Sequence, residues 1–296
     1  MRHLKTIFFA VILLFAASSV ALAQATDCAE DDHDCLIAFY SKALKSNPKD
    51  VESYYNLGRA HQLKGNLKEA IENYDRYLAA GVTDPESLSD AYNNRAIAHR
   101  AAGDLEKAAA DYTKAIELRP ENASFYVNRG NVFVDLKRHD DAIKDYDKAI
   151  SLEPEKAAAL IGRGLAYSAR GDADNAISDF TKALEIAPEP EAYYNRGVLY
   201  SQKREFAKAV ADYTKYIESD VKDTAKLADG YLNRAIAVYY STNDAERSIA
   251  DATEAIKANP KLVNAYRVRA LLYREVGKND LSAADEKKAA ELAGSR

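Results

Sequence analysis

Tryptophan is absent from the 296-residue sequence, methionine occurs once, and only two cysteines are present, Cys28 and Cys35. After residue 23 the chain lacks any apolar run of the roughly 20 residues that a membrane-spanning helix requires. It also lacks runs of basic residues, and its formal net charge is −5. These absences argue against a membrane span in the mature chain. They also argue against nucleic acid or anionic lipid as the main partner.

Catalytic signatures are missing as well. The sequence has no glycine-rich phosphate loop, no His-Glu-x-x-His motif and no nucleophile elbow. The histidines that follow residue 23 are expected to be solvated: His33, His61, His99 and His139. We therefore expect a protein that is not an enzyme and that has no cofactor and no metal site.

The N-terminal residues have the pattern of a secretory signal peptide. Arg2 and Lys5 precede an apolar run over residues 7–17, and Ala21-Leu22-Ala23 forms a small-x-small cleavage site. We expect cleavage after Ala23, and an uncleaved membrane anchor is the alternative. Removal of the two basic residues changes the formal net charge to −7, with 39 basic and 46 acidic residues remaining.

Export favours a disulfide between Cys28 and Cys35. Seven residues of α-helix would separate their Cα atoms by about 10 Å, which is too far for a bridge. A disulfide therefore requires residues 28–34 to form a loop, followed by a helix that begins near Leu36. Free thiols, or a metal bound with His33, remain the alternatives.

A five-residue pattern recurs along the chain: tyrosine, a spacer residue, Asn-Arg, then glycine or alanine. It occurs at residues 92–96, 126–130, 193–197 and 231–235, and looser copies end at residues 58, 164 and 270. Successive copies are 33 to 38 residues apart. A period near 34 residues indicates stacked supersecondary units rather than one globular core.

Other positions recur when the residue that closes this pattern is numbered 8. Alanine recurs at positions 20 and 27, an aromatic residue at 24 and proline at 32. Small residues let two helices approach closely, aromatic rings fill the space between them, and proline ends the second helix. Full repeats then begin at Val51, Ser89, Ala123, Ala157, Pro190, Ala228 and Val263.

These residues resemble the tetratricopeptide repeat family over about residues 36–292, with seven full repeats after a leading half repeat. The resemblance implies an all-α, right-handed superhelical solenoid of antiparallel helix pairs that binds proteins or peptides in a concave groove. The expected organisation is a signal peptide (1–23), an N-terminal segment with the cysteine pair and a leading helix (24–50), and the solenoid (51–296).

Two repeats depart from the pattern in the same way. They carry Tyr77 and Tyr216 at position 27 in place of alanine, lack the terminal proline, and are followed by four extra residues. Four residues are about one helical turn, so the next first helix can lengthen, with Asp84 as the N-cap of the first such helix. Residues 90–98 and 229–237 also match closely, which indicates duplication of a block of about four repeats.

Position 7 is arginine and position 23 is aspartate in the same six repeats. We predict structural ion pairs between them, either within a repeat or between neighbours. The alternative is that the arginines bind a ligand. The pairs are Arg95 and Asp111, Arg129 and Asp145, Arg163 and Asp179, Arg196 and Asp212, with Arg234, Asp251, Arg269 and Asp285 completing the series.

In the fold that the resemblance implies, positions 2, 5, 6, 9, 12 and 13 of each first helix face the groove. Position 6 is asparagine at Asn56, Asn94, Asn128, Asn195 and Asn233. Such a row can hold an extended peptide by its backbone, or the amides can bond water and neighbouring helices. The groove is expected to be polar near its start and apolar towards the C-terminal half, with candidate peptide-binding residues Arg59, Arg100, Tyr194, Ile236, Tyr239 and Tyr240.

We therefore expect an exported protein-interaction scaffold, periplasmic or alternatively secreted, that binds a protein or an extended peptide. Self-assembly into a structural scaffold, as a homo-oligomer, is a second hypothesis. A third is a non-catalytic adaptor subunit of a cell-envelope or polysaccharide-export complex.

Overall fold

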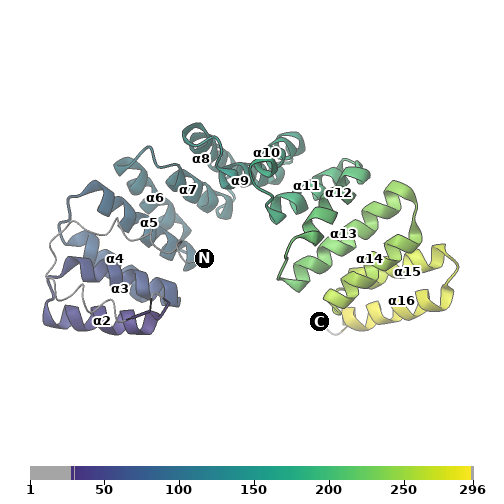
Figure 1. Ribbon diagram of the computed structural model, residues 1–296, viewed down its shortest axis with the longest axis horizontal. Helices are drawn as coiled ribbons and strands as arrows, with labels where there is room; N and C mark the ends of the chain where they lie inside the picture. Colours follow the sequence, from purple (N-terminus) through teal and green to yellow (C-terminus); the bar gives the residue numbers. More distant parts are fainter. Residues whose placement is uncertain (1–27, 30, 295–296) are drawn as a thin grey trace, which may run out of the picture. The chain divides into compact units, whose positions relative to one another are not determined.

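The computed structural model describes residues 28–29 and 31–294, and every regular element in that part of the chain is an α-helix (Figure 1). The expected signal peptide and its cleavage site lie outside the described residues. Within the described residues, no helix combines the length and apolar character needed to span a membrane.

The first compact unit ends at Glu121. Its helices are α2 (His33–Ser46), α3 (Val51–Lys64), α4 (Leu67–Ala79), α5 (Pro85–Ala101) and α6 (Leu105–Leu118). Each helix packs against the next one in the chain, and the first helices α3 and α5 also touch. The unit is therefore a leading helix followed by two helix pairs.

The second compact unit begins at Asn122 and contains five helix pairs. Its helices are α7 (Ala123–Asp135), α8 (His139–Leu152), α9 (Ala157–Ala169), α10 (Ala173–Ile186), α11 (Pro190–Gln202), α12 (Phe206–Glu218), α13 (Thr224–Thr242), α14 (Ala245–Ala258), α15 (Val263–Glu275) and α16 (Asn279–Gly294). Each second helix packs against the next first helix, and α7, α9, α11 and α13 touch in series. The predicted all-α fold of seven pairs after a leading helix is confirmed. The division at Glu121 was not predicted.

Small residues face aromatic rings in the core, both within the first five helix pairs and between successive pairs. A Cβ atom added at Gly162 of α9 would lie 2.5 Å from the Tyr146 ring of α8, and Tyr146 is 1% exposed. Gly58, Gly130, Gly164 and Gly197 meet the position-24 ring of their own repeat in the same way. Small residues are needed at these positions because a larger side chain would overlap a ring that cannot move.

The two first helices that follow the atypical repeats are longer than the others, as predicted. Helix α5 has 17 residues and α13 has 19, whereas α7, α9, α11 and α15 have 13 each. Asp84 caps α5 by accepting the Ser87 N–H, and Asp223 caps α13 by accepting the N–H groups of Ala225 and Lys226. The four inserted residues therefore extend a helix rather than a loop.

His99 is buried, although it was expected to be solvated. His99 in α5 is only 7% exposed, and its Nδ1 atom lies 3.3 Å from the Asp104 carboxylate. The packing of α6 against α5 covers the ring, which the spacing of charged residues did not indicate.

Candidate protein-binding face

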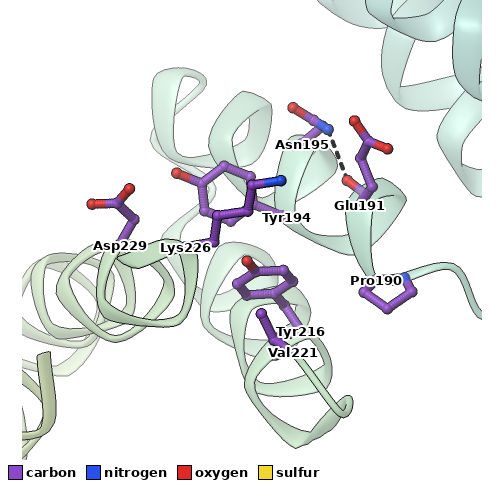
Figure 2. Close-up of a pocket in the computed structure, with 8 residues that line it drawn as sticks. All are labelled: Pro190, Glu191, Tyr194, Asn195, Tyr216, Val221, Lys226 and Asp229. Carbon is purple, nitrogen blue, oxygen red and sulfur yellow. Dashed lines mark hydrogen bonds between the residues drawn. The ribbon is translucent and has the colours of Figure 1, made fainter. Parts of the chain in front are cut away.

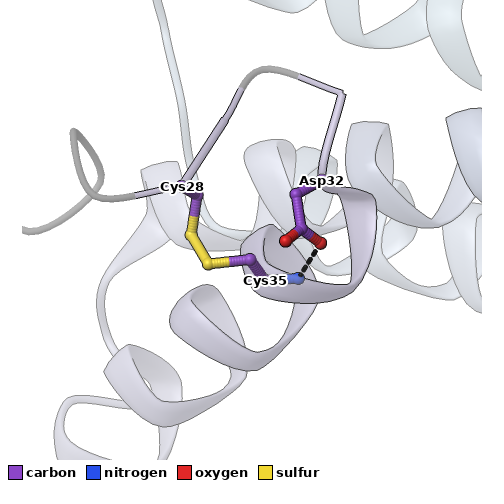
Figure 3. The surroundings of a disulfide bond; sticks show 3 residues. All are labelled: Cys28, Asp32 and Cys35. Carbon is purple, nitrogen blue, oxygen red and sulfur yellow. Dashed lines mark hydrogen bonds between the residues drawn. A yellow bond between two sulfur atoms is a disulfide. The ribbon is translucent and has the colours of Figure 1, made fainter.

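The N-terminal disulfide fixes the start of α2. Cys28 and Cys35 are bonded with their Cα atoms 5.7 Å apart, and the Asp32 carboxylate accepts the Cys35 N–H at 2.9 Å (Figure 3). Helix α2 begins at His33 rather than near Leu36, so Cys35 lies in its first turn. The loop that the bridge requires is therefore shorter than expected. Both thiols are used in the bond, so they are not metal ligands in this structure.

The arginine at position 7 pairs with the aspartate of its own repeat. Arg163 donates from Nε and Nη2 to the two carboxylate oxygens of Asp179, at 2.8 and 2.7 Å. The same two-pronged pairing joins Arg95 to Asp111, Arg129 to Asp145, Arg196 to Asp212, Arg234 to Asp251 and Arg269 to Asp285. The hydrogen bonds that Arg163 donates to Asp179 raise the pKa of the Arg163 guanidinium.

In five of these arginines the third nitrogen reaches the second helix of the preceding repeat, a contact that was not predicted from the sequence. Arg163 Nη1 donates to Asp147 at 2.6 Å, and Arg95 Nη1 donates to Asp75 at 2.6 Å. Arg196, Arg234 and Arg269 donate instead to Thr181, Thr214 and Thr253. All five acceptors stand at position 25, where the recurrence of Asp or Thr was the available signal. Each guanidinium therefore bridges three helices and is used by the fold.

The asparagines of the first helices are engaged within the protein. Asn56 and Asn195 donate to backbone carbonyls of their own helices, at 3.1 and 2.8 Å. Asn94 donates to the Tyr55 hydroxyl at 2.9 Å, and Asn233 donates to the Tyr194 hydroxyl at 3.1 Å. All four are partly buried, as is Asn128 in α7. Each of these four amide nitrogens has a second N–H, which could donate to a peptide backbone. Peptide binding by the asparagine row therefore stays a prediction.

An apolar cavity of 450 Å³ opens between α13 and α15. Its lining residues are Ile236, Tyr239, Tyr240, Leu271, Leu272, Arg274 and Glu275. Tyr240 is 60% exposed and Leu271 is 61% exposed, and the Phe206 ring stacks on Tyr240 at 5.1 Å. Exposed apolar side chains gathered around a cavity are typical of an interaction surface.

A second cavity, of 390 Å³, lies between α11, the end of α12 and the start of α13 (Figure 2). Its lining residues are Pro190, Glu191, Tyr194, Asn195, Tyr216, Val221, Lys226 and Asp229. The atypical repeat creates it: Tyr216 replaces a small residue, and the added turn of α13 supplies Lys226, while Asp229 stands at position 2 of the next repeat. Burial, with the nearby Asp223 carboxylate, raises the pKa of Asp229.

The candidate residues from the sequence thus divide among several places. Tyr194 and Asn195 line the α11–α13 cavity, and Ile236, Tyr239 and Tyr240 line the α13–α15 cavity. Arg59 in α3 and Arg100 in α5 are exposed in the first unit. Other lining residues were not predicted from the sequence: Glu191, Tyr216, Lys226 and Asp229 in the α11–α13 cavity, and Leu272, Arg274 and Glu275 in the α13–α15 cavity.

Comparison with known families gives matches over much of the repeat region. Two family models, each described as tetratricopeptide repeat, match residues 50–121 and residues 93–157, 128–189 and 161–223. Photosystem I assembly protein Ycf3 of Synechococcus sp. (strain CC9902) is 33% identical over 90 residues, which are 30% of this chain and 51% of the relative. The chain therefore spans about half the length of that curated relative.

Solved structures share the fold. The crystal structure of MamA is 30% identical and superimposes with a TM-score of 0.52 over 58% of this chain and 96% of that one. The C-terminal part of a TPR repeat-containing protein from Cytophaga hutchinsonii gives a TM-score of 0.66 at 19% identity. That match covers 84% of this chain and 98% of the other.

Proposed function

Because the chain belongs to the tetratricopeptide repeat family, we propose that it is an exported, non-catalytic scaffold that binds an extended segment of another protein. The binding face is formed by the first helices α11, α13 and α15. The α13–α15 cavity carries this proposal, because Tyr240 and Leu271 leave most of their surface exposed beside it.

The energetics favour the α13–α15 cavity as the centre of the interface. Aromatic and aliphatic anchors that enter a preformed cavity supply most of the affinity in many interfaces, and polar neighbours supply orientation. Arg274 and Glu275 border the cavity with one charge of each sign, while Asn195 of α11 and Asn233 of α13 lie on helices that contribute to the same face. An extended segment with a large apolar side chain suits this arrangement.

Export to the periplasm, or alternatively secretion, belongs to the same proposal. Its support is the signal-peptide pattern of residues 1–23 and the Cys28–Cys35 disulfide, because such bonds persist in oxidising compartments. N-terminal sequencing of protein recovered from a cell-envelope fraction would test it. A chain that begins at Gln24 is expected, and a chain that keeps Met1 would contradict it.

The binding face is tested by affinity capture from envelope extract with residues 24–296 as bait and identification by mass spectrometry. The test variant is Leu271→Asp. The control is Leu63→Asp, because Leu63 at the end of α3 is also 61% exposed but lies outside the cavity. A partner that is kept by the control and lost by the test variant supports the α13–α15 cavity. Equal retention by both variants rejects it.

A fourth bait tests the asparagine row, with Asn94, Asn128, Asn195 and Asn233 all changed to Ala. Because Asn94 and Asn233 also bond to tyrosines of the preceding first helix, its helix content and melting temperature must first match the wild type. Loss of the partner by a folded variant supports backbone capture by the row. Sedimentation of each bait shows whether the occupant of the face is a second copy of the chain instead.

A further inference from the structure

The α11–α13 cavity combines aromatic rings with carboxylates. The Tyr194 and Tyr216 rings lie 5.0 Å apart at an angle of 51°, and Glu191 and Asp229 stand on the two helices beside them (Figure 2). Among the described residues, neither carboxylate has an ion-pair partner, although Lys226 also lines the cavity. Tyr194 is partly exposed and Tyr216 only 6% exposed, so the wall offers mainly the Tyr194 ring, backed by Tyr216, and two acceptors of charge-assisted hydrogen bonds.

The first unit contains a second copy of this arrangement, 139 residues earlier. Tyr55 and Tyr77 lie 5.2 Å apart at 46°, and Glu52 and Asp90 are the counterparts of Glu191 and Asp229. The close agreement of the ring geometry indicates that both copies keep the same local packing.

The copies differ in the cations near their aspartates: Lys226 lines the α11–α13 cavity where the first unit has Ser87, and only the first unit has an arginine paired with its aspartate. In the first unit Arg119, the C-cap of α6, forms an ion pair with Asp90 and lies 3.6 Å from Glu86. The C-cap of α14, at the matching place, is Asn259, which accepts the Lys261 N–H instead. The chain's own guanidinium thus neutralises one copy, and the other copy lacks it.

We propose that the α11–α13 cavity binds an arginine side chain of the partner polypeptide. The guanidinium would pair with Asp229 and lie against the Tyr194 ring, because a guanidinium is planar and weakly hydrated and stacks readily on aromatic rings. Lys226 opposes a cation but is exposed, so its ammonium can move into solvent. This inference rests on the proposed function, since it assigns one side chain of the segment that the face would hold.

Helix α13 links the two cavities and sets the spacing of the bound residues. Asp229 lies at one cavity, and Ile236 and Tyr240 lie at the other, seven and eleven residues along the same helix. At about 1.5 Å per residue this is roughly 10–16 Å. An extended chain advances about 3.3 Å per residue, so the arginine is expected about three to five residues from the apolar anchor.

The test is an NMR titration of 15N-labelled protein (residues 24–296) with N-acetyl-arginine methylamide. N-acetyl-citrulline methylamide, which has the same shape without the charge, is the matched probe. The arginine compound is expected to shift the amide signals of Tyr194, Tyr216 and Asp229, and the citrulline compound is expected to leave them in place. Free L-arginine is the third probe, and it should bind no more tightly than the blocked compound.

Three variants and a control sharpen the result. Asp229→Asn should weaken binding about ten-fold, as expected for the loss of one charge-assisted hydrogen bond. Lys226→Gln should strengthen binding, because it removes a competing cation. Asn259→Arg should abolish it by supplying an internal guanidinium. Asp90→Asn, the matching change in the first unit, should leave the titration at Tyr194 unchanged.

Equal shifts with the arginine and citrulline compounds would overturn the inference, as would unchanged binding by Asp229→Asn. Tighter binding of free L-arginine would point to a small-molecule site and would also overturn it. The proposed function is tested separately. If capture of the partner depends on Leu271 but not on Asp229, the arginine proposal is rejected and the proposed function is retained.

Discussion

The Tyr194 hydroxyl accepts a hydrogen bond from the side-chain amide of Asn233 on the next first helix, 3.1 Å away. Tyr55 and Asn94 make the same contact in the first unit at 2.9 Å. Asn94 and Asn233 therefore link neighbouring first helices by hydrogen bonds. Tyr55 and Tyr194 also belong to the two copies of the aromatic and acidic arrangement, so these hydrogen bonds hold in place the rings that a ligand would contact.

Arg163→Leu is expected to lower the stability of the folded protein by about 3 kcal/mol without changing its helix content. Asp179 is only 3% exposed, so the variant leaves a buried carboxylate without its partner. Thermal unfolding followed by circular dichroism measures the change. Arg170→Leu is the control, because its pair with Asp140 is largely exposed and should contribute less than about 1 kcal/mol. Equal melting temperatures for Arg163→Leu and wild type would contradict the pairing.

Gly162→Ala is expected to destabilise the protein by roughly 1–2 kcal/mol. Alanine gains about 1 kcal/mol of helix propensity over glycine, but its Cβ would lie 2.5 Å from a fully packed Tyr146 ring, and the clash outweighs the gain. Urea unfolding compares the variant with Gly294→Ala, where nothing lies within 4 Å of the added atom. A Gly162→Ala protein at least as stable as wild type would show that the ring can shift.

Removal of the disulfide by Cys28→Ser and Cys35→Ser should loosen α2 and leave the distant helices unaffected. Closure of so short a loop contributes about 2 kcal/mol, and in a repeat protein each element is supported mainly by its neighbours. Hydrogen exchange read by mass spectrometry should therefore rise in residues 33–46 and stay constant in α16. Unaltered exchange across α2 would show that packing on α3 suffices.

The protein is expected to lose stability between about pH 10 and pH 12. Burial raises the pKa of Tyr213 to about 12, against about 10 in the unfolded chain. Above pH 10 the unfolded state releases a proton that the folded state keeps, so the unfolding free energy falls with rising pH, by up to roughly 2–3 kcal/mol for this residue. Burial raises the pKa of Tyr74 and Tyr112 too, in the same direction.

Urea unfolding at pH 9, 10.5 and 12 measures this dependence. Tyr213→Phe serves as the control, because phenylalanine keeps the ring and cannot ionise. The variant should show a shallower fall in unfolding free energy than the wild type. Identical pH profiles would mean that the Tyr213 hydroxyl titrates normally in the folded protein.

The helix pairs were predictable because local residues determine them: the small residues, the position-24 rings, and caps such as Asp84. The pairing of arginine with aspartate was predictable, because the two residues occur in the same six repeats. The sequence left open whether each pair lies within a repeat or joins two neighbouring repeats. The hydrogen-bond partners of the asparagine side chains were harder to predict from the sequence. An asparagine amide can bond its own helix or a neighbour with similar energy, as Asn195 and Asn233 do. The α11–α13 cavity depends on how Tyr216 and the added turn of α13 pack together, which no single position in the sequence reveals.

The confinement of each Arg–Asp pair to one repeat has a consequence for how the gene can change. A recombination event that copies or deletes a whole repeat carries both buried charges with it, so neither end of the altered segment is left with an orphaned carboxylate. Had the pairs joined only successive repeats, an arginine at the first repeat of the array or an aspartate at the last would have lacked its partner. The pairing therefore lets the number of repeats change over evolutionary time. The arginine of a repeat can also donate to either aspartate or threonine at position 25 of the preceding repeat, so the new neighbour can carry either residue.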